Sequence, residues 1–134
     1  MTHLTSRLAS LQPYALALLR IVAGYTYLLH GTAKLFGLPH IERFDGLSWL
    51  SLMGVAGMLE TVGGTLLVLG LFTRPVAFVL SGMMAVAYFM AHASAGTVLL
   101  PLLNGGEPAV LFCFVFLYLA TAGGGAWALD RARR

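Results

Sequence analysis

Charged residues are scarce in this chain, and their scarcity excludes an ordinary soluble domain. Only 10% of the 134 residues are charged, whereas 59% are hydrophobic, and the mean hydropathy is +0.86. A soluble protein of this size cannot bury so much apolar surface in its core, so lipid must cover the remainder. The net charge of +3 comes mainly from cations placed where helix ends should meet headgroups. We therefore expect no nucleic-acid partner.

Cysteine occurs once, at Cys113, inside an apolar run. A single thiol excludes an internal disulfide, a Cys-x-x-Cys redox pair and a thiolate metal cluster. Any redox chemistry therefore needs another electron carrier.

Four apolar runs are each long enough to cross a bilayer as a helix. We expect these spans at about residues 14–36, 50–72, 76–98 and 109–127. Pro13 suits the first turn of the first helix, and Pro75 marks a short connection that makes spans two and three antiparallel neighbours. The sequence predicts an all-α fold in which residues 1–134 form one integral membrane domain, a four-helix bundle.

The distribution of cations predicts the orientation of this bundle. Four spans place both termini on one side, and the cations on that side outnumber those on the other. The side with the termini carries Arg7, Arg74, Arg131, Arg133 and Arg134, and the opposite side carries Lys34 and Arg43. By the positive-inside rule, we expect the termini to face the cytoplasm.

Ionisable residues inside the predicted spans indicate the faces that point into the bundle, because a charge exposed to lipid is expensive. His30, Glu60 and His92 each lie near or on a helical face with small residues, which allow close helix packing. Helical rise places all three toward the outer side of the membrane. The candidates for ligand binding or proton relay in this outward pocket are Tyr27, His30, Lys34, Glu60, Tyr88, His92, Asn104 and Glu107; none is assigned a catalytic role.

Two interpretations of this cluster stay open. Imidazoles beside a carboxylate can relay protons or hydrogen-bond the carbonyl oxygens of a quinone. Alternatively, Glu60 pairs with Arg20 or Lys34 and the cluster simply locks the helices together. A metal is not expected, because no local His-x-x-x-His or Glu-x-x-His spacing is present.

Three further charged residues are candidates for structural ion pairs or anchors: Arg20, Arg74 and Asp130. Arg20 lies close to the cytoplasmic end of the first span. We expect its long side chain to extend to the headgroups there.

The most specific motifs lie in the first span: Leu19-Arg20-Ile21-Val22-Ala23-Gly24 and His30-Gly31-Thr32-Ala33-Lys34-Leu35-Phe36-Gly37. They resemble the opening of DoxX family membrane proteins. The similarity continues nearly to the end of the chain, through Glu60-Thr61-Val62-Gly63-Gly64, Gly70-Leu71-Phe72-Thr73-Arg74, His92, Asn104-Gly105-Gly106-Glu107 and Gly123-Gly124-Gly125-Ala126-Trp127 to Leu129-Asp130.

The resemblance implies a four-helix protein of the bacterial inner membrane, linked to sulfur oxidation, quinone reduction and oxidative or thiol stress. We accordingly expect a non-autonomous membrane subunit of a redox system, with electrons supplied by a protein partner and a quinone as the candidate cofactor. Lipid is the second expected partner, and another copy of the chain is a further candidate. The alternative is a non-catalytic scaffold or assembly factor. A permease is disfavoured, because the sequence shows no internal repeat.

Overall fold

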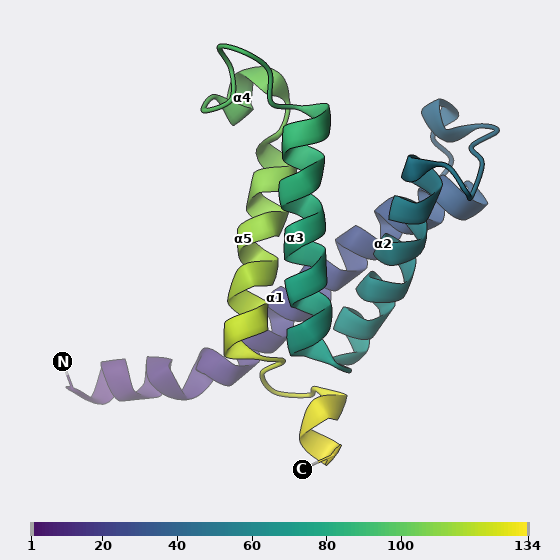
Figure 1. The fold of residues 1–134 in the computed structure, drawn as a ribbon. Helices are drawn as coiled ribbons and strands as arrows, with labels where there is room; N and C mark the ends of the chain where they lie inside the picture. The colour runs from purple at the N-terminus through teal and green to yellow at the C-terminus, as the bar shows by residue number, and fades with distance from the viewer. Residues whose placement is uncertain (1, 134) are drawn as a thin grey trace. The chain divides into compact units, whose positions relative to one another are not determined.

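The structure, a computed structural model, describes residues 2–133, which form helices and loops with no strand among them (Figure 1). The elements are α1 (Thr2–Phe36), η1 (Glu42–Phe44), α2 (Leu52–Leu69), α3 (Thr73–Ala91), α4 (Pro101–Asn104), α5 (Glu107–Ala122) and η2 (Leu129–Arg133). They divide into two compact units. The first contains residues 2–73 and 124–133, and the second contains Arg74–Gly123.

The all-helical prediction is confirmed. Two helices, α2 and α3, are long and apolar enough to cross a membrane, and α5 is a shorter apolar helix of 16 residues. A single four-helix bundle and cytoplasmic termini stay predictions.

Three helix ends differ from the predicted spans by five residues or more. α1 begins at Thr2, so Pro13 lies inside the helix and not in its first turn. α3 ends at Ala91 and not near Val98, because Ser94 and Gly96 form turns there. α5 ends at Ala122, since the next residue, Gly123, has a φ of 87° that a side chain would disfavour.

The first unit is built on α1 and α2, whose backbones approach closely at glycines. An ideal Cβ on Gly31 would lie 2.5 Å from the backbone nitrogen of Thr61, and one on Gly64 would lie 2.8 Å from the carbonyl oxygen of Gly24. Such contacts leave no room for side chains. The glycines therefore allow the close approach of α1 and α2 that the sequence predicts, since membrane helices associate mainly by close packing.

The second unit contains α3 and α5, which lie side by side (Figure 1). The hydroxyl of Ser81 on α3 donates a hydrogen bond of 2.8 Å to the Cys113 carbonyl on α5. At the end of α5, the Arg74 guanidinium donates to the carbonyls of Ala120, at 3.3 Å, and Thr121. A cation at the C-terminus of a helix satisfies unpaired carbonyls and favours the helix dipole, so Arg74 joins the start of α3 to the end of α5.

We predict that Gly64→Leu lowers the midpoint of thermal unfolding in detergent. The new side chain would collide with the α1 backbone, and overpacking of this kind costs about 1–3 kcal/mol. Gly82→Leu on α3 is the matched control, because a Cβ there meets no atom within 4 Å. Equal midpoints for the two variants would contradict the close packing of α1 and α2.

Candidate functional site

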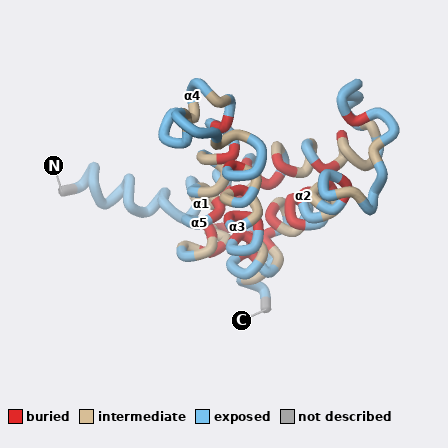
Figure 2. Tube along the Cα trace, turned by 45° about the horizontal axis from the view of Figure 1, so that its top comes forward, coloured by how far each residue is buried: buried red, intermediate tan, exposed pale blue. Residues whose placement is uncertain are grey.

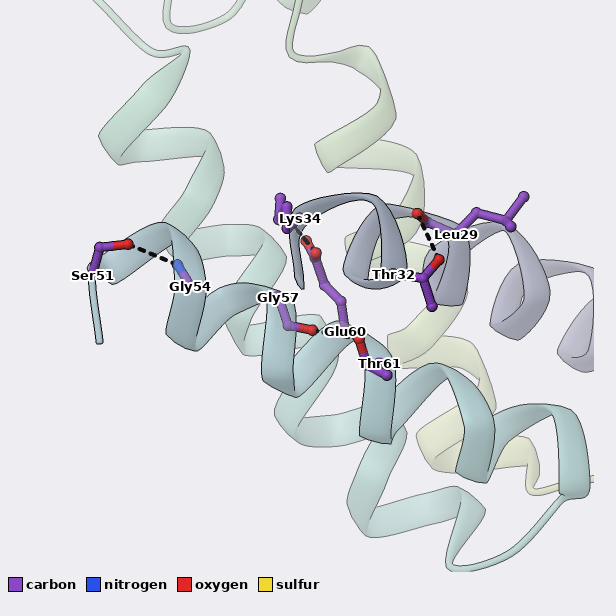
Figure 3. A network of polar contacts seen from close by, with 8 residues as sticks. All are labelled: Leu29, Thr32, Lys34, Ser51, Gly54, Gly57, Glu60 and Thr61. Atoms are coloured by element: carbon purple, nitrogen blue, oxygen red, sulfur yellow. Dashed lines mark hydrogen bonds and ion pairs between the residues drawn. The ribbon is translucent and has the colours of Figure 1, made fainter. Parts of the chain in front are cut away.

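A buried ion pair joins α1 and α2 in the first unit. The ammonium of Lys34, in the last turn of α1, lies 2.6 and 2.7 Å from the two carboxylate oxygens of Glu60, near the middle of α2 (Figure 3). Their side chains are only 10% and 5% exposed. Of the two pairings considered for Glu60, the structure therefore shows the one with Lys34.

Small and aromatic residues shape the surroundings of this pair. Gly57, one turn before Glu60, leaves space for the stem of Lys34, since a Cβ there would lie 3.0 Å from the Lys34 Cβ. Phe44 from η1 is buried, and the Lys34 ammonium lies 5.8 Å from the centre of its ring. The pair is thus covered by the loop that joins α1 to α2, and nearby aromatic electron density favours the cation.

His30 and Tyr27 lie on the same helix as Lys34 but differ in exposure. His30 precedes Lys34 by one helical turn and its side chain is exposed, whereas Tyr27 is buried at 1% exposure. Residues four apart on a helix are neighbours. The first unit therefore brings an exposed imidazole next to a buried ion pair.

A separate polar cluster organises residues 92–106 in the second unit. Asn104 donates from its side chain to the hydroxyl of Tyr88 (3.0 Å), which donates in turn to the carbonyl of Val98 (2.8 Å). His92 Nδ1 donates to the Asn104 carbonyl (3.2 Å), and the Asn104 side-chain oxygen accepts from the Gly106 amide (2.8 Å). These bonds hold the connection between α3 and α5 in place.

The predicted site residues thus fall into two groups. Tyr27, His30, Lys34 and Glu60 belong to the first unit; Tyr88, His92 and Asn104 belong to the second, as does the exposed Glu107 in the first turn of α5. A common pocket for His30, Lys34, Glu60 and His92 stays a prediction. Among residues 2–133, no three His, Cys, Asp or Glu side chains are grouped so that they could hold a metal ion.

The expectation that Arg20 extends to the headgroups is wrong, because its side chain is 0% exposed. Its guanidinium donates to the carbonyls of Leu67 (2.5 Å) and Val68 (2.7 Å) at the end of α2, and to those of Gly124 (2.8 Å) and Ala126 (3.4 Å). Unpaired carbonyls at the end of α2 and in the glycine-rich segment supply these acceptors inside the protein. Sequence reasoning missed these partners because it compared only side-chain pairs.

Asp130 holds the same C-terminal segment at a second point. Its carboxylate accepts hydrogen bonds from the amides of Phe72 (2.7 Å) and Thr73 (2.9 Å), where α3 begins, and its own amide donates to the Gly70 carbonyl (2.9 Å). A carboxylate at a helix N-terminus satisfies free amides and favours the dipole. Asp130 therefore serves as a cap supplied from 57 or more residues away.

The rest of the segment packs on α1. The Ala126 amide donates to the Pro13 carbonyl (2.8 Å), and the rings of Trp127 and Tyr14 meet edge to face at 5.4 Å. We call residues 124–130, held by Arg20 and by these contacts, the C-terminal clasp. The clasp connects α1, the end of α2 and the start of α3.

Comparison with known proteins identifies the family. The sequence model of DoxX matches residues 15–93, which is more than half of the chain. The chain belongs to the DoxX family. A relative from Haemophilus influenzae, described as an uncharacterized protein, is 47% identical over 127 residues, which cover 93% of this chain and 95% of the relative. No solved structure matches.

Family membership and the apolar helices together make the chain a membrane protein. The residues that match the DoxX model include Arg20, His30, Lys34, Glu60 and His92. The match ends before Asn104 and the C-terminal clasp.

We predict that Arg20→Lys strongly destabilises the protein although it preserves the charge. One ammonium cannot reach carbonyls on both sides of the guanidinium, and each lost hydrogen bond to a charged donor costs about 1.5–3 kcal/mol. The variant should unfold at lower temperature in detergent and lose its C-terminal segment to protease sooner. Arg7→Lys, at an exposed position of α1, is the control; if the two variants behave alike, the clasp does not depend on the guanidinium.

Double substitution should reveal the energetics of the Lys34–Glu60 pair. Lys34→Leu or Glu60→Leu alone leaves an unpaired buried charge and should cost about 3–5 kcal/mol of stability. The double variant should recover most of that loss, because an apolar pair of similar volume needs no counter-charge. Thermal unfolding of all three variants measures the coupling; additive losses would mean that the two charges are stabilised independently.

Proposed function

We propose that this protein is the membrane subunit of a redox system in the bacterial inner membrane, and that His30, Lys34 and Glu60 form its site for a quinone or a similar small oxidised molecule. The observation that carries the proposal is the exposed His30 one turn from the buried Lys34–Glu60 pair. The proposal is built on the first unit alone. The bacterial relative and the excess of arginine near the termini support the inner membrane with cytoplasmic termini.

The exposure of His30 suits a substrate that is dissolved in lipid. A side chain exposed within a membrane span meets the bilayer or a ligand in it, so a quinone could approach the imidazole laterally without a deep cavity. A ring N–H of His30 would donate to a quinone carbonyl. Buried charges in a membrane protein commonly mark such functional positions.

The Lys34–Glu60 pair would supply protons to this site. Reducing a quinone to a quinol takes two electrons and two protons, and the electrons would come from a partner oxidoreductase. The protonated imidazole of His30 would give a proton to the developing oxyanion and would be reprotonated by way of Lys34, which would regain its proton from water at the membrane surface. The same sequence would run once for each of the two protons. The chain thus contributes binding and proton transfer to a reaction that its partner completes, which makes it a non-autonomous subunit.

A second candidate, a non-catalytic scaffold or assembly factor, is favoured by a different observation. Arg20, Glu60 and Asn104 each have hydrogen-bond partners within their own unit. Polar residues satisfied in this way fix helix positions and need no ligand. In this alternative the same protein partner binds, but no quinone does.

Extraction of lipids from the gently purified protein distinguishes the two candidates. We expect quinone in the extract of the wild type, and at least several-fold less from His30→Ala, when the molar ratio of quinone to protein is measured by mass spectrometry. His40→Ala is the matched control, because this exposed histidine pairs with Asp45 in the loop after α1.

The result that would overturn the quinone proposal is equally measurable. Quinone at the same ratio in wild type, His30→Ala and His40→Ala would indicate carry-over with bulk lipid. No quinone in any of them, together with normal folding, would favour the scaffold.

A further inference from the structure

The start of α1, residues 3–12, is an exposed stretch of helix with a leucine stripe. Residues 3–15 are all exposed, as Figure 2 shows for the start of the chain. Leu4, Leu8 and Leu11 are 65%, 58% and 56% exposed. Their spacing of four and three residues places them on one side of the helix, so an apolar stripe faces outward without cover from the rest of the first unit.

The other sides of this segment are polar and carry positive charge only. Arg7 lies in it and no acidic residue does, since the first carboxylate in the chain is Glu42. The hydroxyls of Ser6 and Ser10 donate to the carbonyls of His3 (3.0 Å) and Arg7 (2.7 Å) in the same helix. The serine hydroxyls are therefore satisfied locally and need no protein partner.

The length of α1 separates this segment from the hydrocarbon layer. Its 35 residues extend about 52 Å at the usual rise, whereas the hydrocarbon core is about 30 Å thick. To fit entirely inside, the helix would have to tilt beyond the range of about 0–40° seen for membrane helices. Pro13, inside α1, has no amide for the Ala9 carbonyl and is a usual place for a helix to bend.

We propose that residues 2–12 form an interfacial helix that binds the membrane surface through anionic lipid headgroups. The leucine stripe would enter the boundary between headgroups and acyl chains, and Arg7 would contact lipid phosphates. Arg131 adds a second exposed cation in the segment that contacts α1 at Pro13. The stripe has only three leucines and is flanked by serines and by the cation Arg7, with no acidic residue in the segment. This composition fits a membrane surface better than the core of a protein interface.

Site-directed labelling of the full chain in vesicles tests this proposal. In a Cys113→Ser background, an environment-sensitive fluorophore is placed at Leu8→Cys or, on the opposite face, at Ser6→Cys. Vesicles contain phosphatidylcholine alone or with phosphatidylglycerol. With phosphatidylglycerol, we expect lipid-borne quenchers to reach the Leu8 label and iodide to reach the Ser6 label.

Charge variants supply the second measurement. Arg7→Gln should shift the ratio of lipid quenching to iodide quenching at Leu8 toward water by about fivefold, as expected for one basic residue near an anionic surface. High salt should act in the same direction. Arg43→Gln, beyond the other end of α1, is the control and should leave the ratio unchanged.

Two outcomes would overturn the proposal. Equal access of iodide to both labels in phosphatidylglycerol vesicles would place the segment in water. Protection of the Leu8 label from both quenchers, with cross-linking between Leu8→Cys copies, would mean that a second copy of the chain covers the stripe.

Discussion

The guanidinium of Arg20 holds the first unit together at the end opposite the Lys34–Glu60 pair. A charged group without exposure needs many hydrogen bonds, and here backbone carbonyls from two distant parts of the chain provide them. The end of α2 and the C-terminal clasp are thereby fixed relative to α1. Asp130, in the same clasp, accepts from the amides of Phe72 and Thr73.

The sequence predicts the presence of the long helices because each corresponds to a long apolar run. Apolar runs bounded by Gly, Pro and charged residues leave few alternatives to helices in lipid. The start of α1 differs from the predicted one because Pro13 suits the first turn of a helix, whereas here it lies inside a helix that begins at Thr2. The sequence predicts a later end for α3 than the structure has, because Ala, Val and Leu continue the apolar run beyond Ala91, where the chain forms turns.

The site is only partly predictable from the sequence, because several of its side chains bond to backbone carbonyls and not to other side chains. Lys34–Glu60 was one of two pairings compatible with the sequence, and only the packing of α1 against α2 distinguishes them. The partners of Arg20 and His92 are carbonyl groups, which every residue carries and which leave no signature in the sequence. Asn104 was identified as a candidate ligand-binding residue, yet its visible contacts all stabilise the connection between α3 and α5.

The C-terminal clasp has a consequence for how the protein is made. Arg20 is synthesised before Gly124 and Ala126, which supply two of its four acceptors and lie 104 and 106 residues later in the chain. Until then the guanidinium has only part of its final hydrogen bonding, and the first amides of α3 lack the Asp130 carboxylate. Completion of the first unit therefore waits until residues 124–130 have been synthesised, so that a product that stops before them would keep an incompletely compensated charge at Arg20.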